Sequence, residues 1–117
     1  MAVGECRGYG RWLAERAGRI GLLVMADGSA RRGPRAPGYE DTQALQVDHI
    51  LGEALHTGET EPFYNLEPDL AEELLVGGRV AWQVFAGACE GRTVEAKCRY
   101  SDDPFGVWYP VFTWLLS

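Results

Sequence analysis

The sequence predicts one mixed domain over residues 1–117, α/β (or α+β), with a small sheet holding a central apolar strand, three to four helices and a C-terminal antiparallel hairpin. Three patterns predict this class. Residues 20–25 form a short unbroken apolar run, residues 42–56 and 80–88 carry apolar side chains at helical spacing, and residues 93–100 alternate strictly. A length of 117 residues is close to the commonest domain size.

The N-terminal third predicts a helix and then a strand. Residues 11–19 predict a short helix that ends at Gly18. The apolar run at 20–25 does not alternate, which is typical of a strand covered on both faces. A loop rich in Gly, Pro and Arg follows as far as Gly38.

The middle of the chain predicts three helices. Asp41 is a suitable N-cap for a helix over residues 42–56. Residues 57–65 predict a loop, and Pro68 fits the first position of a second helix that stops at the following Gly-Gly pair. Residues 80–88 predict the third helix.

The C-terminal quarter predicts the hairpin. Residues 93–100 alternate as a half-buried strand, 101–106 form the turn, and 107–115 return as an aromatic-rich strand. Pro110 lacks a backbone donor, so we expect it at an edge or a bulge. The alternation predicts Cys98 as a small core residue. The three cysteines show no Cys-x-x-Cys spacing, so neither a disulfide framework nor a thiolate zinc site is expected.

The composition excludes several classes of protein. Apolar residues make up 46% of the chain, and its four Trp, five Tyr and four Phe must be buried, which argues against disorder. The longest apolar run, residues 20–26, is far shorter than the roughly 20 residues of a membrane-spanning helix. No signal peptide is recognisable, so we expect a cytoplasmic protein without membrane contact.

The net charge of −6 is unevenly distributed. Residues 1–35 hold seven Arg against three acidic residues, a balance of +4, and residues 36–91 hold eleven acidic residues against one Arg, a balance of −10. This acidic middle argues against nucleic-acid binding. The only basic cluster, Arg31, Arg32 and Arg35, suits one small anionic ligand.

The loop after the predicted strand is the first candidate site. Ligands of open α/β sheets lie beyond the carboxyl ends of strands. There Asp27 could orient a group or bind a cation, and Ser29 could donate a hydrogen bond. Arg31, Arg32 and Arg35 could clamp a carboxylate or phosphate. The alternative is a structural turn, in which Asp27 and Ser29 bond their own backbone and the Arg side chains stay in water.

A second candidate lies on the helix over residues 42–56. His49, Glu53 and His56 share one face, and two His with one carboxylate is a ligand set for non-haem iron. That face lies opposite the apolar stripe, and three ligands from one straight helix bind a single metal poorly. We therefore interpret it as a solvated polar face and expect no metal ligand and no catalytic residue.

Five motifs occur in one order that is similar to a known family. The motifs are LLVMADGSARR at 22–32, APGY at 36–39, AEELLVGGR at 71–79, AWQV at 81–84 and PFGV at 104–107. They resemble the C-terminal half of actinobacterial proteins classed as class III extradiol dioxygenase B-subunit-like, over roughly Trp12 to Trp114.

The resemblance implies a fold and a ligand-facing loop more firmly than an activity. Enzymes of that superfamily cleave catechol-type rings with O₂ at a ferrous iron held by two His and one Glu. Their iron-binding His residues lie in an N-terminal half without a counterpart here. A further acid/base His ends a segment Ser-Gly-Asp-Leu-Ser-His, and Ala30 stands at that position. Alanine cannot transfer a proton.

Two hypotheses follow. In the favoured one, the chain is a non-catalytic module without a cofactor that binds a small anionic ligand or a partner chain through the Arg-bearing loop. In the alternative, it is part of a ring-cleaving dioxygenase that another polypeptide completes with the Fe(II) ligands. Because the strand at 20–25 needs cover that this short chain does not supply, we expect a homo-oligomer or an N-terminal-half partner protein.

Overall fold

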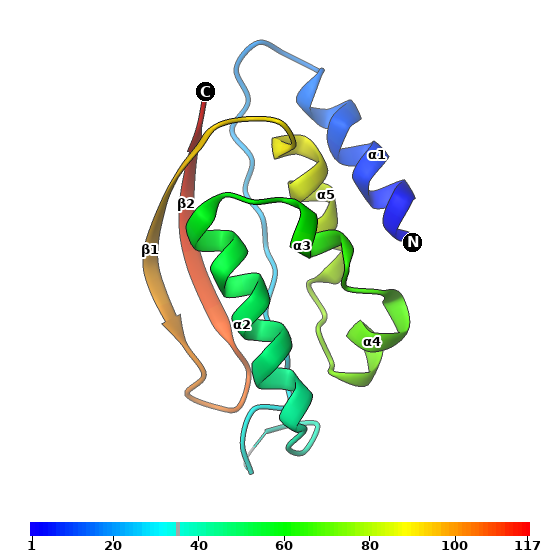
Figure 1. Cartoon of the computed structure of the whole chain (residues 1–117), viewed down its shortest axis with the longest axis vertical. Coiled ribbons are helices and arrows are strands. Elements are labelled where there is room, and N and C mark those ends of the chain that lie inside the picture. The colour runs from blue at the N-terminus through cyan, green and yellow to red at the C-terminus, as the bar shows by residue number, and fades with distance from the viewer. Residues whose placement is uncertain (35) are drawn as a thin grey trace.

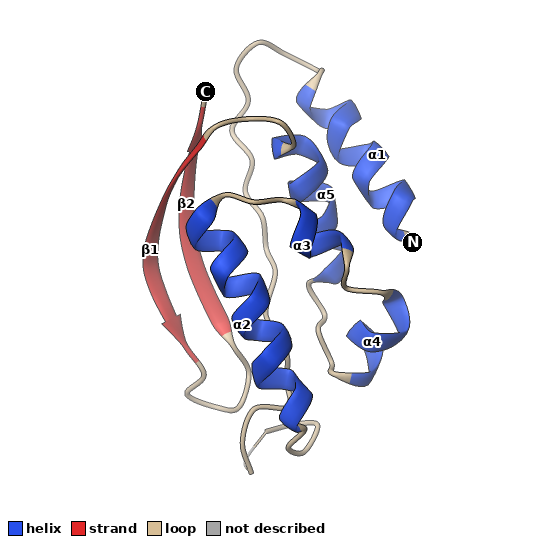
Figure 2. Ribbon diagram, viewed as in Figure 1, coloured by secondary structure: helices blue, strands red, loops and turns tan. Residues whose placement is uncertain are grey.

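A computed structural model of the chain describes residues 1–34 and 36–117. It confirms the mixed class, with helices in the first three quarters and a C-terminal antiparallel hairpin (Figure 2). The elements are α1 (Val3–Ala14), α2 (Thr42–Thr57), α3 (Glu61–Tyr64), α4 (Pro68–Glu73), α5 (Arg79–Cys89), β1 (Val94–Asp102) and β2 (Tyr109–Leu116). No helix in this described part is long and apolar enough to cross a bilayer.

The elements are arranged in two groups (Figure 1). Helix α2 covers one face of the hairpin, and α1 lies along α5 on the other side of the molecule. An extended stretch of chain from α1 to the loop before α2 runs between β2 and α5 (Figure 1). The core fills the space between these groups, with Phe63, Leu51 and Leu74 among its most buried side chains.

Helix α2 begins at Thr42 as predicted and ends at Thr57, one residue beyond the predicted range, and both of its ends carry capping residues. The Asp41 side chain accepts a hydrogen bond from the Gln43 amide at 3.0 Å. Gly58 ends the helix in the left-handed region at φ 82°, where a side chain would collide with Val94. This glycine therefore sets both the helix end and its distance from β1.

Helix α1 begins eight residues before its predicted start at residue 11 and ends at Ala14 instead of Gly18. The physical reason is a close crossing with α5. A methyl group on Gly10 would collide with the Val84 carbonyl, and one on Gly87 with the Arg7 carbonyl. Glycines are poor helix formers in isolation, and here their small size permits a contact that stabilises the helix.

Residues 57–65, predicted as a loop, contain the short helix α3. Phe63 on α3 is 1% exposed and lies 6.2 Å from the ring centroids of both Trp82 and Phe85. The buried Gln83 amide donates to the carbonyls of Phe63 and Leu66 at 2.9 and 2.8 Å. These long-range bonds fix a turn too short to show helical periodicity in the sequence.

The predicted helices on either side of the Gly-Gly pair are confirmed in part. Helix α4 begins at Pro68 as predicted but ends at Glu73, before the glycines, and Leu75 then adopts a left-handed φ of 53°. Helix α5 extends one residue beyond residues 80–88 at each end.

The hairpin pairs Val94 with Leu116 at its open end and Asp102 with Tyr109 at the turn. Its inner face packs on α2, where the Trp114 indole donates to the Leu55 carbonyl at 2.8 Å. Pro110 lies in a two-stranded sheet in which each strand is an edge, as expected.

The prediction that Cys98 is a core residue is wrong, because its side chain is exposed. The register of the hairpin shifts between Cys98 and Tyr100, and every residue of β1 from Cys98 onward is exposed. This half of the strand projects beyond the core, so alternation in the sequence does not correspond to burial there.

The prediction of a central apolar strand at residues 20–25 is also wrong. Within the described residues the sheet has two strands only, and this stretch is extended without pairing. Val24 and Ala26 pack against the core, whereas Leu23 is 85% exposed and Met25 78% exposed. The apolar run therefore has one covered face and one open face. We call residues 20–26 the apolar segment.

Candidate functional site

The Arg-bearing loop is anchored to the start of β2. The Gly28 amide donates to the Trp108 carbonyl at 2.7 Å, and the Trp108 amide donates to the Ser29 carbonyl at 3.0 Å. A side chain on Gly28 would collide with the Trp108 ring. The backbone of the loop is thus held tightly against a buried tryptophan.

Ser29 is fully buried, and its partner lies on another element. Asp48 of α2, 2% exposed, accepts from the Ser29 amide at 3.0 Å and from the Ser29 hydroxyl at 2.5 Å. Burial raises the pKa of the Asp48 carboxyl, against the opposing effect of these hydrogen bonds and of the Arg32 charge. The Ser29 hydroxyl therefore positions the loop, and its proton is already donated within the chain.

Arg31 joins the loop to the helices around it. Its Nε donates to the Tyr39 carbonyl at 3.0 Å and its Nη1 to the Glu73 carbonyl at 2.9 Å. The guanidinium also lies 3.6 Å from a carboxylate oxygen of Asp41, the N-cap of α2. These contacts favour a structural role for Arg31.

Arg32 has a different environment. Its Nε lies 3.3 Å from an Asp103 oxygen and 3.6 Å from an Asp48 oxygen, but it is buried without a hydrogen-bond partner among the described residues. The guanidinium carbon is 6.0 Å from the centre of the Trp108 ring. Arg32 thus lies between α2 and the turn of the hairpin with hydrogen-bonding capacity left over.

Of the other two predicted loop residues, only Asp27 lies in the described part of the chain, and it is not brought to this cluster. Asp27 is exposed at the end of the apolar segment, where it follows Ala26 directly. Arg35 lies outside the described residues. Ligand binding by any of the five residues of the loop stays a prediction.

A polar groove of about 400 Å³ lies between α2 and the hairpin. His49, Glu53 and His56 are exposed along the helix side of this groove, as their predicted polar face requires. In the described ranges, no three His, Cys, Asp or Glu side chains are placed to hold a metal ion. The groove is lined by Arg32, Leu45, Asp48, His49, Gly52, Glu53, His56, Ser101 and Trp108.

Asp48 is not among the site residues that the sequence predicts, although one signal identifies it. It is a charged residue within the apolar stripe of α2, four residues after Ala44 and three before Leu51, both of which are buried. A carboxylate at such a position requires a buried partner. The identity of that partner, Ser29, has no local signal.

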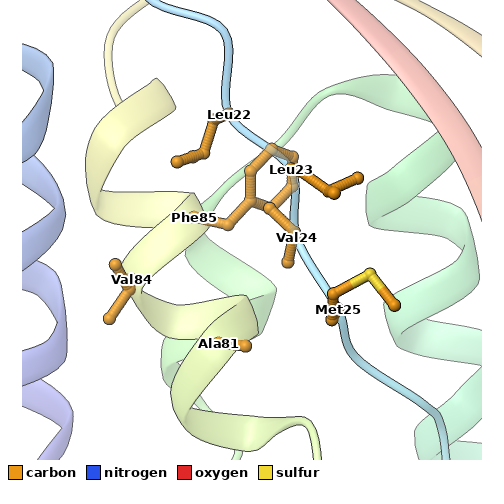
Figure 3. Close-up of a pocket in the computed structure, with 7 residues that line it drawn as sticks. All are labelled: Leu22, Leu23, Val24, Met25, Ala81, Val84 and Phe85. Carbon is orange, nitrogen blue, oxygen red and sulfur yellow. The ribbon is translucent and has the colours of Figure 1, made fainter.

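A second concavity, of about 190 Å³, is apolar and lies between the apolar segment and α5. Figure 3 shows Phe85 reaching the segment, while the side chains of Leu23 and Met25 point away from α5. The lining residues are Leu22, Leu23, Val24, Met25, Ala81, Val84 and Phe85.

The backbone of this stretch is unpaired as well. Across residues 17–27, no amide or carbonyl makes a backbone hydrogen bond to another described residue; the first such bond comes from Gly28. An extended chain with free donors and acceptors is a template for another strand.

No family model, curated protein or solved structure matches this chain, so the resemblance to extradiol dioxygenase-like proteins rests on its sequence motifs alone.

Proposed function

We propose that this chain is a non-catalytic binding module that takes up a partner polypeptide by strand addition along the apolar segment. The observation that supports the proposal is the unpaired backbone of residues 17–27 beside the exposed side chains of Leu23 and Met25. In strand addition, main-chain hydrogen bonds supply affinity, and alternate side chains supply specificity.

The segment lacks the features by which proteins protect an edge. Residues 20–26 contain neither a charged residue nor Pro. Lys, Pro or a bulge are the usual means of preventing unwanted pairing along a free strand. A long, extended and apolar stretch without them is typical of a strand that a partner covers.

The Arg-bearing loop supports this function by fixing the end of the segment. Gly28 and Ser29 follow the segment after Asp27, and their bonds to Trp108 and Asp48 determine where it ends. The partner is a second copy of the chain or a protein that resembles the N-terminal half of extradiol dioxygenase-like proteins.

A second candidate function is the binding of a small molecule in the polar groove. Arg32 lines this groove, and its guanidinium favours a ligand that brings an acceptor oxygen, such as a carboxylate or phenolate. The groove and its rim hold three carboxylates for this one guanidinium, those of Asp48, Glu53 and Asp103. A ligand with several negative charges is therefore disfavoured.

A probe peptide tests strand addition directly. At concentrations where the full chain is monomeric, we expect a capped ten-residue peptide of alternating Val and Thr to bind it and to slow deuterium exchange of the amides in residues 20–27. The same peptide with Pro at alternate positions should not bind, because it lacks the amide donors.

Matched variants locate the binding. Leu23→Glu should weaken peptide binding about tenfold or more, because a carboxylate replaces an exposed apolar contact. Leu115→Glu is the control, since Leu115 is another exposed leucine, on β2. Equal effects of the two variants, or no protection of residues 20–27, would show that the segment is not the binding surface.

A further inference from the structure

We infer that the partner is a second copy of this chain, paired antiparallel through the apolar segment about a two-fold axis at Leu23. This inference rests on the proposed function, that the segment takes up a strand. A two-fold axis is the simplest closed arrangement, because it covers the same surface on both copies.

Charge complementarity sets the register. Arg19 and Asp27 flank the segment at equal distances from Leu23, and both are exposed. In an antiparallel pair centred on Leu23, Arg19 of each copy lies opposite Asp27 of the other, so two opposite-charge pairs form. Neither residue has an ion-pair partner among those that the structure describes.

Other registers lose this match. A parallel pair in register places Arg19 opposite Arg19 and Asp27 opposite Asp27, which is repulsive. An antiparallel pair centred on Leu22 places Arg19 opposite Met25, and one centred on Val24 places Asp27 opposite Gly21. The charges therefore select one register of an otherwise permissive apolar strand.

The side chains agree with the same register. Leu23, the most exposed large apolar residue, meets its own copy at the axis. Met25 of one copy lies opposite Gly21 of the other, and the space where a Gly21 side chain would point is open. Leu22, Val24 and Ala26 alternate with these residues, so each copy keeps them toward its own α5 and core.

Charge reversal tests the inference on the full chain by sedimentation equilibrium. We expect the wild type to dimerise, and Arg19→Asp or Asp27→Arg alone to raise the dimer dissociation constant about tenfold, because each creates two like-charge pairs. The double variant should restore the wild-type constant. Both positions are exposed, so folding is not at risk.

Cross-linking gives the register independently. In a Cys98→Ser background, which removes the exposed native thiol, Leu23→Cys should form a disulfide-linked dimer rapidly under mild oxidation. Met25→Cys is the control, because Met25 is also highly exposed but faces Gly21 of the other copy.

The outcomes separate this inference from the proposed function. A monomer at all concentrations that still binds the Val/Thr peptide overturns the second copy and leaves strand addition intact. A dimer that charge reversal does not affect, or equal cross-linking at positions 23 and 25, shows that the copies meet elsewhere. Failure of the peptide to bind a demonstrated monomer overturns both.

Discussion

Asp48 and Ser29 are joined by two hydrogen bonds across 19 residues of sequence, one from the Ser29 amide and one from its hydroxyl. The carboxylate is nearly inaccessible to water, and both bonds end on it. Ser29 follows the apolar segment closely in sequence, so this contact ties the segment to α2. The position of the proposed binding strand therefore depends on one buried acid.

Replacing that acid should destabilise the whole domain. Asp48→Ala leaves the Ser29 amide and hydroxyl buried without an acceptor, so we expect a loss of about 2–3 kcal/mol in the free energy of unfolding. Urea denaturation measures it. Glu53→Ala, at an exposed position on the same helix, is the control and should change stability little. A small effect of Asp48→Ala would mean that the loop is held by other contacts.

The pH dependence of stability should carry the signature of Asp48. Burial raises its pKa above the ordinary value of 3.8, so the folded chain holds this proton more tightly than the unfolded chain. The contribution of Asp48 to stability is therefore greatest below about pH 3.8 and falls as the pH rises through the raised pKa. The unfolding free energy of the wild type relative to Asp48→Asn should decrease across that window.

Glu90 provides a comparison of opposite sign. Its hydrogen bonds with Arg7 and then Arg11 lower the pKa of its carboxyl. The stabilisation that Glu90 provides is present above its unfolded pKa and is lost as the pH falls through the lowered value. Wild type relative to Glu90→Gln should thus lose stability on acidification. Parallel curves for the two variants would contradict the assignment of Asp48.

The crossing of α1 and α5 should tolerate no added methyl group. Gly10→Ala and Gly87→Ala each place a carbon against the backbone of the other helix, and we expect a loss of about 1–3 kcal/mol for each. Gly8→Ala is the matched control on α1, because the space there is open. That variant should gain about 0.5–1 kcal/mol from helix propensity. Thermal unfolding distinguishes these three changes.

The sequence predicts most of the regular structure and little of what holds it in place. Helix α2 and the hairpin are predicted because periodicity, the Asp41 cap and alternation are local properties. Helix α3 is not, because Phe63 and Leu66 owe their conformation to the Gln83 amide at the other end of a long-range contact. Helix α1 begins early for the same reason, since its glycines are favourable only against α5.

Prediction of the candidate site from the sequence is limited in the same way, as the apolar segment shows. The predicted strand at residues 20–25 does not form within the described structure, because the rest of the fold decides whether an apolar run has strand neighbours. Leu23 and Met25 are exposed whereas Val24 between them packs against the core. The apolar run in the sequence does not alternate, so it gives no sign of this difference. The roles of Ser29 and Arg31 likewise depend on acceptors that lie far away in sequence, on Asp48 and Glu73.

Metal content tests the alternative enzymatic hypothesis. We expect elemental analysis of the purified chain to find less than stoichiometric iron, zinc and copper, because His49 and His56 lie about two helical turns apart on one exposed face. About one tightly bound metal per chain, lost in His49→Ala, would reverse this prediction. Co-expression with an N-terminal-half protein followed by the same measurement tests the completed form.

Replacing Arg31 and replacing Arg32 should lower the free energy of unfolding by different amounts. Arg31 donates two hydrogen bonds to backbone carbonyls, so Arg31→Ala should lower the unfolding free energy by about 1–2 kcal/mol.

Arg32→Ala removes a guanidinium whose Nε has no hydrogen-bond partner in the described residues, and it leaves Asp48 without a nearby cation. These effects on the free energy of unfolding oppose each other. Removing a buried donor that has no hydrogen-bond partner raises stability, whereas removing the cation beside Asp48 lowers it and raises the pKa of that carboxyl further. We therefore expect a smaller change in stability at neutral pH than for Arg31→Ala, with Arg99→Ala as the exposed control. If Arg31→Ala matches that control, Arg31 is free for a ligand, and the anion-binding interpretation of the loop gains support over the structural one.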